Sequence, residues 1–176
     1  MAIPHFSNDR ICLRAVEPED LDVFYRMEND PELWEISTFT TVPYSRYALE
    51  FYIKNSANDI YIDKQLRLMI ARRNNPTVLG TIDLTDFVPL HSRAAVGIAL
   101  LEEHRGKGYA KDALSLLCNY AFDFLQLKQL YAHIPADNEA SLNLFGKCGF
   151  RNCGTMKAWL QAGKTYKDVV MMQLIR

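Results

Sequence analysis

The residues best suited to chemistry in this sequence form a short segment between a predicted strand and a predicted helix. They are Arg105, Gly106, Lys107, Gly108, Tyr109 and Ala110, followed by Lys111. The two glycines leave backbone N–H groups uncovered at a helix N-terminus, where the first four N–H groups lack partners and the helix dipole attracts anions. Three basic side chains add positive charge beside them. This pattern predicts a site for a phosphate or pyrophosphate group.

A plain strand-to-helix turn also uses two such glycines, so the residues alone leave that structural alternative open. Two other nucleotide-binding patterns fit less well. A dinucleotide-binding fingerprint needs a third glycine within a parallel strand–helix–strand unit, whereas Lys stands at position 111 and the preceding strands look antiparallel. A P-loop needs Gly-Lys-Ser or Gly-Lys-Thr after four spacers, which this segment does not have.

The elements before and after the segment must position it. Residues 66–71 alternate in the manner of a strand, and a turn at residues 74–76 leads into a second strand at 78–84. Residues 93–101 predict a third, so the middle of the chain is an antiparallel meander. After Gly108 the apolar period becomes that of a helix. Its expected buried face consists of Ala110, Ala113, Leu114, Leu117, Ala121, Phe124 and Leu125.

The N-terminal part predicts a strand and two helices. Residues 10–16 alternate, and Pro18 suits the first position of a helix of about ten residues that buries Leu21, Phe24 and Tyr25. A second helical pattern opens at residues 41–43 and continues, with an aromatic surface, to Asn55.

The C-terminal part predicts a strand at residues 130–134, a helix at 139–147 ended by Gly149, and a hairpin that turns at Ala162-Gly163. No repeat, low-complexity tract or linker divides the chain, so we expect a single domain over residues 1–176. The predicted fold class is α/β (α+β): a mixed, mostly antiparallel sheet of six or seven strands with helices on both faces.

Composition excludes several classes of protein. Hydrophobic residues make up 49% and charged residues 23%, and the formal net charge is −1, so the chain lacks the basic surface that nucleic acids and anionic membranes attract. Residues 1–14 carry no signal-peptide pattern, and no apolar stretch reaches the length that crosses a bilayer. We expect a cytoplasmic protein. The four cysteines show no metal-ligand spacing, so no metal is expected.

The glycine segment resembles the acetyl-CoA loop of the GNAT superfamily of acetyltransferases. That family marks the loop with Gln or Arg, two free positions, Gly, one free position and then Gly or Ala. Arg105, Gly108 and Ala110 match the three fixed positions. The resemblance implies that acetyl-CoA is the co-substrate and that residues 105–111 hold its pyrophosphate.

The surroundings of the loop also resemble the family. There the loop follows a bulged strand at the end of an antiparallel meander, opens the long central helix, and is followed by a strand, an Asn and a short helix that closes with Gly-Phe. Asn138, Ser141 and Gly149-Phe150 stand here in that order. The resemblance therefore extends from residue 66 to the C-terminus.

By the same resemblance, Ile98, Ala99 and Leu100 offer backbone groups to the pantetheine arm, and one of their amides acts as an oxyanion donor to the thioester carbonyl. Asn138 and Ser141 contact the far side of the arm. Asn138 also suits the cap of the helix that begins at residue 139, which requires no ligand.

One position departs from the family's catalytic pattern. Many members have, at the position of Phe145, a Tyr that is thought to protonate the departing CoA thiolate, and a phenyl ring has no proton to donate. The sequence leaves water, Tyr109 or a tyrosine from the acceptor segment as the proton source.

The nearest branch contains the spermidine acetyltransferases and the ribosomal-protein N-terminal acetyltransferases. The chain resembles this branch at Leu13-Arg14, which stand before an acidic Pro-Glu-Asp helix start at residues 18–20. Spermidine enzymes carry adjacent glutamates just before a Pro-Tyr that resembles Pro43-Tyr44, whereas residues 41–42 here are Thr and Val. Ala95 replaces an acidic strand residue of those enzymes. A polyamine, another small amine and a protein N-terminus all stay open as acceptors.

Acceptor binding is expected at residues 30–52, which are rich in aromatics and carboxylates and face Asp83 and Asp86. Glu35 and Asp83 are the candidate catalytic carboxylates, and for each the alternative is a solvated surface group. Three histidines stay undecided between a surface and a catalytic role: His91, His104 and His133.

These expectations together predict an N-acetyltransferase in which a primary amine attacks acetyl-CoA directly within a ternary complex. A different class also stays open, namely a CoA-binding sensor or interaction module that keeps the cofactor site without turnover. The partner is a small-molecule amine or a protein N-terminus, and a homo-oligomer is left open.

Overall fold

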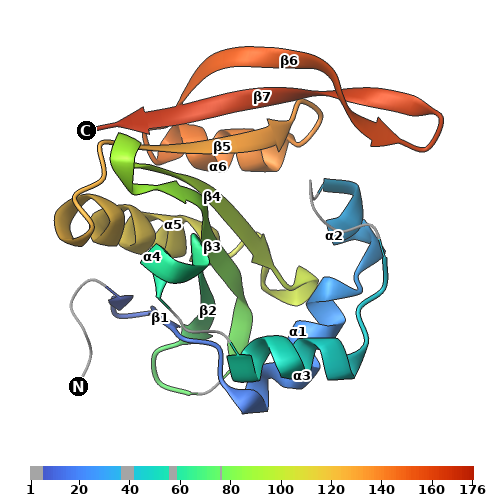
Figure 1. Cartoon of the computed structure of the whole chain (residues 1–176), viewed down its shortest axis with the longest axis vertical. Helices are drawn as coiled ribbons and strands as arrows, with labels where there is room; N and C mark the ends of the chain where they lie inside the picture. The colour runs from blue at the N-terminus through green and yellow to red at the C-terminus, as the bar shows by residue number, and fades with distance from the viewer. Residues whose placement is uncertain (1–5, 37–41, 56–58, 76) are drawn as a thin grey trace.

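The computed structural model describes residues 6–36, 42–55, 59–75 and 77–176, and it contains one seven-stranded sheet (Figure 1). Neighbouring strands are antiparallel throughout, with the exception of β4 and β5. The predicted mixed, mostly antiparallel sheet is therefore confirmed. The strands in their spatial order are β1 (Ile11–Arg14), β2 (Leu66–Arg72), β3 (Val78–Val88), β4 (Arg93–Leu100), β5 (Gln129–Pro135), β7 (Thr165–Ile175) and β6 (Arg151–Ala162).

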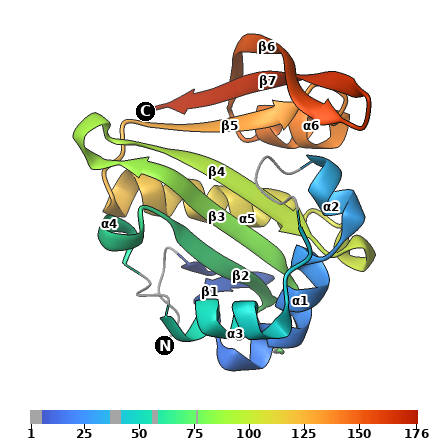
Figure 2. The same cartoon turned by 45° about the vertical axis from the view of Figure 1, so that its right-hand side comes forward.

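Helices cover both faces of this sheet. Figure 2 shows α5 behind β3 and β4, and α1 and α3 on the opposite side. Among the residues described, no helix combines the length and the apolar character that crossing a bilayer requires. The α-helices are α1 (Leu21–Glu28), α2 (Pro31–Ile36), α3 (Arg46–Asn55), α4 (Ile60–Asp63), α5 (Tyr109–Asn119) and α6 (Glu139–Lys147).

The main core lies between α5 and the sheet. Ala113, Leu114 and Leu117 of α5 are fully buried and belong to one apolar cluster with inward-facing strand residues such as Ile82 and Leu84. These α5 positions follow the helical period that the sequence shows, and the strand residues follow a period of two. Burying apolar surface on this scale is the main force that holds α5, and thus its N-terminus, against the sheet.

The long helix differs from prediction at its C-terminal end. Its α-helical part ends at Asn119, and Tyr120–Phe124 forms a π-helical turn in which the Leu125 N–H donates to the Tyr120 carbonyl. A π turn shifts the phase of the later residues. Ala121 stays buried, but Phe124, which the sequence assigned to the buried face, is 66% exposed and stacks on Tyr120.

The helix expected to open at residues 41–43 begins later. Thr41 lies outside the described residues, and α3 begins at Arg46, where the Ser45 hydroxyl accepts a hydrogen bond from the Ala48 N–H at 3.1 Å. Ser is a preferred N-cap residue, and this signal fixes the start of α3. Only Leu49 of its aromatic-rich sequence is buried, and Tyr47 projects into solvent.

The N-terminal helix is fastened to the sheet by a buried carboxylate. Asp20 accepts two hydrogen bonds from Arg14 of β1, at 2.6 and 2.7 Å, and a third from the Glu17 N–H at 2.9 Å. Burial alone would raise the pKa of Asp20, but these three bonds together lower it. Asp20 thus stays charged and fixes the direction in which α1 leaves β1.

Candidate active site

The central feature of the site is a fork between two strands. β4 and β5 are paired only from Arg93 to Ala95, opposite Gln129 to Tyr131. Beyond that point β5 continues along β7, while β4 continues along β3 as far as Leu100. Residues 96–100 of β4 therefore have no β5 partner among the described strand pairs, and their edge is available to a ligand that can hydrogen-bond to a backbone.

A glycine on β3 keeps the end of β4 in place. A Cβ built on Gly80 would lie 2.1 Å from the Ala99 carbonyl oxygen, a distance that no real side chain tolerates. Glycine is thus required at this position, because β4 approaches β3 unusually closely there. The sequence did not single out Gly80.

The predicted phosphate loop lies directly after the open end of β4. Gly106 and Gly108 both have left-handed backbones, with φ values of 73° and 83°. Gly108 is the N-cap of α5, and its carbonyl accepts the Asp112 N–H at 3.2 Å. Gly106 has empty space where a Cβ would stand. Uncovered amides and the positive end of an eleven-residue helix thus meet at the mouth of the fork.

The basic residues of the loop are placed differently from one another. Arg105 donates from Nε to the Leu100 carbonyl at 3.1 Å and reaches Glu32 of α2 at 3.3 Å. Lys107 is exposed, and its Nζ donates to the Glu103 carbonyl at 2.7 Å. Lys111 is exposed on the first turn of α5. All three belong to the loop or the first helical turn, so each can approach an anion bound there.

Tyr109 and Ala110 turn toward the sheet. The Tyr109 ring lies under the guanidinium of Arg10, 4.8 Å from its centroid, and Arg72 approaches it at 5.8 Å. Ala110 is half-buried against the main core. The Tyr109 ring thus contacts the side of the sheet formed by β1 and β2. Its role as a proton donor stays a prediction.

The far wall of the fork is formed by the start of α6. Asn138 caps this helix, because its Oδ1 accepts the Ser141 N–H at 3.1 Å. The alternative of a helix cap is thus realised, and a contact with a ligand stays a prediction for both residues. A solvent-open hollow of about 300 Å³ spans the two walls here. Its lining consists of Glu32, Leu33, Arg105, Asp137, Asn138 and Lys167.

Phe145 of α6 faces the core and is only 3% exposed. Its ring meets that of Phe150 edge to face, with centroids 4.9 Å apart. This is ordinary core packing between aromatic rings. The side chain therefore supports α6 from within.

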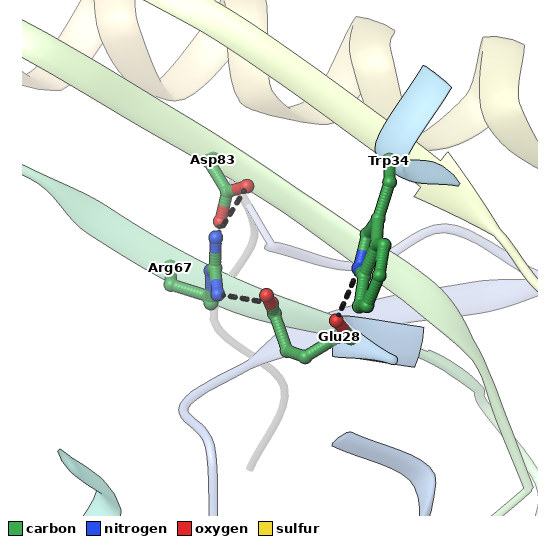
Figure 3. A network of polar contacts seen from close by, with 4 residues as sticks. All are labelled: Glu28, Trp34, Arg67 and Asp83. Atoms are coloured by element: carbon green, nitrogen blue, oxygen red, sulfur yellow. Dashed lines mark hydrogen bonds and ion pairs between the residues drawn. The ribbon is translucent and has the colours of Figure 1, made fainter. Parts of the chain in front are cut away.

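On the other face of the sheet, three charged residues form a chain beside β4. Arg67 of β2 donates from Nε and Nη2 to both oxygens of Asp83 on β3, at 2.7 and 3.3 Å, and from Nη1 to Glu28 of α1 at 2.7 Å (Figure 3). Burial by itself would lower the pKa of Arg67, but the two carboxylates outweigh it and raise this pKa. Asp83 is therefore fixed in a two-pronged ion pair.

Aromatic groups surround this chain of charges. The indole N–H of Trp34 donates to the Glu28 carbonyl at 2.7 Å, so α2 is tied to the end of α1 (Figure 3). The Phe24 and Tyr52 rings stack with centroids 5.8 Å apart, and burial raises the pKa of Tyr52. The backbone of Glu35 belongs to α2, but its side chain lies outside the described residues.

At the apex of the fork, Tyr131 of β5 stands opposite Ala95, the last paired residue of β4. Its hydroxyl donates to the carboxylate of Asp86, and burial together with this bond raises the pKa of Tyr131 to about 12. The ring of His133, on the same strand, is exposed and meets Tyr131 edge to face at 5.4 Å. His104 ends the turn before Arg105, and its Nδ1 is buried without a partner among the described residues.

Sequence reasoning missed Arg67 and Glu28. A signal for Arg67 was present, because a hairpin that turns near residue 75 places position 67 opposite position 83. The observed register has that pair. A charged residue in the middle of an otherwise apolar strand, directly opposite an Asp, indicates an ion pair. Glu28 comes from another helix, and no local pattern indicates its contact.

The described geometry fits acetyl-CoA. The free β4 edge suits an extended, amide-containing arm, and the glycine loop with three basic residues suits a pyrophosphate. A Cβ would fill the open space at Gly106, which supports its role as a cradle.

Comparison with known proteins identifies the class. The family described as Acetyltransferase (GNAT) domain matches residues 10–151 of the chain. This match covers the meander, the fork, the loop and α6. The chain therefore belongs to the GNAT acetyltransferase family.

Full-length relatives agree with this assignment. The chain is 29% identical to N-acetyltransferase p20 of Bacillus licheniformis over 96% of its own length and 94% of that protein. It is 24% identical to spermidine N(1)-acetyltransferase of Vibrio cholerae serotype O1, with coverages of 96% and 95%.

The solved structures give the same result. The Vibrio cholerae spermidine N-acetyltransferase in complex with CoA and spermine superposes with a TM-score of 0.83 at 26% identity, over 96% of each chain. A dodecameric structure of that enzyme in an intermediate state gives a TM-score of 0.79 at 26% identity, over 96% of this chain and 95% of that one. The chain is an acetyl-CoA-dependent N-acetyltransferase with the GNAT fold.

Proposed function

We propose that the chain acetylates a primary amine by direct attack in a ternary complex, with acetyl-CoA in the β4–β5 fork and the amine on the face that carries α1 to α3. The observation that carries this proposal is the fork itself, whose free β4 edge ends at the glycine loop. A thioester in the fork is open to the face where Asp83 and Trp34 lie.

The cofactor side has defined roles in this proposal. The amides of the loop at Gly106 and Gly108, together with Arg105, Lys107 and Lys111, bind the pyrophosphate. The backbone of Ile98, Ala99 and Leu100 binds the arm and supplies one oxyanion donor. Asn138 and Ser141 line the far side. When bound, acetyl-CoA supplies an activated thioester.

The acceptor must lose a proton before it can attack. A primary amine with a lysine-like pKa near 10.4 costs about 4–5 kcal/mol to deprotonate at pH 7. Because Asp83 is already engaged by Arg67, it is better suited to positioning the amine than to removing the amine's proton. Glu35 keeps its proposed role as a second carboxylate. The proton otherwise passes to water, and the rate rises with pH as the free amine becomes more abundant.

The absence of a proton donor at Phe145 costs less free energy than deprotonation of the amine does. A thiolate with a pKa of about 8.5 leaves unprotonated at a penalty of roughly 2 kcal/mol at pH 7. Water can protonate it later, and a tyrosine of the acceptor side and Tyr109 are the other proposed donors; Tyr109 would have to leave its position under Arg10 to act in this way. The enzyme is therefore expected to be active with Phe at this position.

We further propose a cytoplasmic enzyme that acts as a single domain and assembles into a homo-oligomer. Two observations support assembly. β6 is one of the two edge strands of the sheet, and its hairpin with β7 exposes Trp159 and Tyr166. A long exposed edge strand presents unpaired backbone groups that can pair with another chain. The Vibrio cholerae relative has a dodecameric structure.

The direct test is thiol release from acetyl-CoA across a panel of amines: monoamines, polyamines, aminoglycosides, amino acids and peptides with free N-termini. Turnover of at least one amine, with product confirmed by mass spectrometry, supports the proposal. Binding of acetyl-CoA with no turnover across the panel would favour the sensor class instead.

A further inference from the structure

Five carboxylates around the acceptor side of the fork are already paired within the described part of the chain. Each of the five accepts a hydrogen bond or forms an ion pair with a residue of another element. The pairs are Glu28 with Arg67, Asp83 with Arg67, Glu32 with Arg105, Glu103 with Arg26, and Asp86 with Tyr131. A ligand with several positive charges would have to compete with these partners.

Arg67 is the centre of this arrangement. Its side chain is 28% exposed, and those of Asp83 and Glu28 are 15% and 19% exposed, so all three are largely shielded from solvent. Charges in such surroundings interact more strongly than on an open surface. The guanidinium also lies over the Phe24 ring, 5.3 Å from its centroid, which fixes its orientation.

This chain of charges lies next to the reacting end of the fork. Asp83 stands opposite Gly97 of β4, two residues beyond the last residue that pairs with β5. A Cβ on Gly97 would lie 3.7 Å from Asp83 Oδ2, so the carboxylate covers the backbone of β4 at that point. Ile98, the first residue assigned to the pantetheine arm, follows directly.

The charges of Glu28, Arg67 and Asp83 sum to −1. Within this chain of three charges, one surplus negative charge suits one ammonium group; the side chain of Glu35 lies outside the described residues and is not part of this sum. A second or third ammonium group of a longer ligand would meet the positive charge of Arg67 within a few ångströms, and like charges in a partly buried site repel each other appreciably. Arg67 also keeps its charge across the working pH range, because its neighbours raise its already high pKa.

We propose that Arg67 is a specificity-determining residue: by offsetting one of the two negative charges of Asp83 and Glu28 it makes the acceptor site select an amine with one ammonium group over a polyamine. This inference rests on the proposed function for the location of the acceptor.

The experiment compares the binding of spermine and n-butylamine by calorimetry, with CoA present, in the natural protein, Arg67→Met and Arg67→Lys. Met removes the charge at similar length, and Lys keeps it. We expect the natural protein and Arg67→Lys to bind spermine no more tightly than n-butylamine. Arg67→Met should bind spermine on the order of 10-fold more tightly than the natural protein, with n-butylamine affinity changed about 3-fold or less.

A measurement that needs no variant guards against misfolding of Arg67→Met. In the natural protein, spermine should bind no more tightly than n-butylamine even at low salt, where the attraction between a polycation and several free carboxylates would be strongest. Spermine binding that becomes tighter than n-butylamine binding as the salt is lowered would overturn the inference. So would spermine binding to the natural protein that is on the order of 10-fold tighter than n-butylamine, or a folded Arg67→Met protein with unchanged spermine affinity.

Kinetics on the same proteins separate this inference from the proposed function. Efficient acetylation of spermine with poor use of n-butylamine would contradict the role of Arg67 and leave the acetyltransferase assignment intact. Binding of n-butylamine without any thiol release would contradict the proposed function, while the binding comparison would still decide the role of Arg67.

Discussion

At the scale of single residues, the loop glycines offer the sharpest test of the cofactor site. Gly106→Ala introduces a left-handed alanine at a cost of about 1–2 kcal/mol and places a methyl group in the space assigned to a phosphate. We expect acetyl-CoA affinity to fall by at least about 10-fold, measured by calorimetry.

Gly163→Ala is the matched control for this change. Gly163 also has a positive φ, 61°, and open space at its Cβ, but it stands in the β6–β7 turn. It should lose similar stability and keep its acetyl-CoA affinity. Equal affinity losses in the two variants would mean that backbone strain acts globally and that the loop is not a phosphate site.

Phe145→Tyr tests the departure from the family's pattern. Because the ring is buried against Phe150, an added hydroxyl without a partner should lower the free energy of unfolding by about 1–3 kcal/mol. Its effect on kcat should be modest, at most about 10-fold upward. The reason is that an unprotonated thiolate leaving group costs less free energy than deprotonation of the amine. A much larger gain in kcat would show that the natural enzyme is limited by the missing acid.

At this scale the sequence indicates backbone features more readily than side-chain partners. Two glycines near basic residues predict a phosphate loop through local geometry, and both have left-handed backbones in the structure. The engagement of both Asp83 and Glu28 by Arg67 depends on three elements meeting in space. A carboxylate looks equally available in sequence whether it is free or paired, so Asp83 was assigned a catalytic role that its ion pair makes less suitable.

At the scale of elements, the buried Asp20 controls how α1 joins the sheet. Asp20→Asn should lower the free energy of unfolding by about 1–3 kcal/mol at pH 7, because Arg14 loses a charged partner. Since the folded pKa of Asp20 is lowered, its stabilisation is present above the ordinary value of 3.8 and is lost as the pH falls toward the folded pKa.

Denaturant melts at several pH values check this prediction. The natural protein should lose stability relative to Asp20→Asn as the pH drops through the acid range. Asp9→Asn is the matched control, since Asp9 is fully exposed and approaches Arg73 at 3.5 Å, and it should change stability by no more than about 0.5 kcal/mol. Parallel pH profiles for the natural protein and Asp20→Asn would contradict the structural role.

Elements with a strong periodic pattern were predicted well, and those that depend on contacts were not. The meander, α5 and α6 follow from apolar periods and caps, and α6 spans the predicted residues 139–147. The π turn at the end of α5 arises from packing that no local rule indicates. The start of α3 was misplaced because the helical pattern was taken to open at residues 41–43, while the Ser45 cap was overlooked.

At the scale of the whole molecule, the account predicts a specific dependence on pH. The value of kcat/KM for a primary amine should rise about 10-fold per pH unit below the pKa of that amine, because only the free amine attacks. Acceptors with lower amine pKa values should reach their plateau at lower pH. If kcat/KM rises over the same pH range for amines of different pKa, the rise would instead come from a titrating group of the enzyme.

The assembled state belongs to this scale as well. Sedimentation velocity should show a species larger than a monomer, and Trp159→Glu on the exposed β6 strand should shift it toward smaller species without lowering the stability of the fold. A natural protein that sediments only as a monomer would remove the proposed homo-oligomer.

The central claim is that acetyl-CoA occupies the β4–β5 fork and delivers its acetyl group to an amine on the α1–α3 face. It is tested most directly by following one amine, n-butylamine, and acetyl-CoA together by mass spectrometry, in the natural protein and in Gly106→Ala. We expect N-acetylated amine to form in equal amount with free CoA, and we expect Gly106→Ala to form less of it unless the acetyl-CoA concentration is high. CoA release without acetylated amine, or unchanged use of acetyl-CoA by Gly106→Ala, would contradict it.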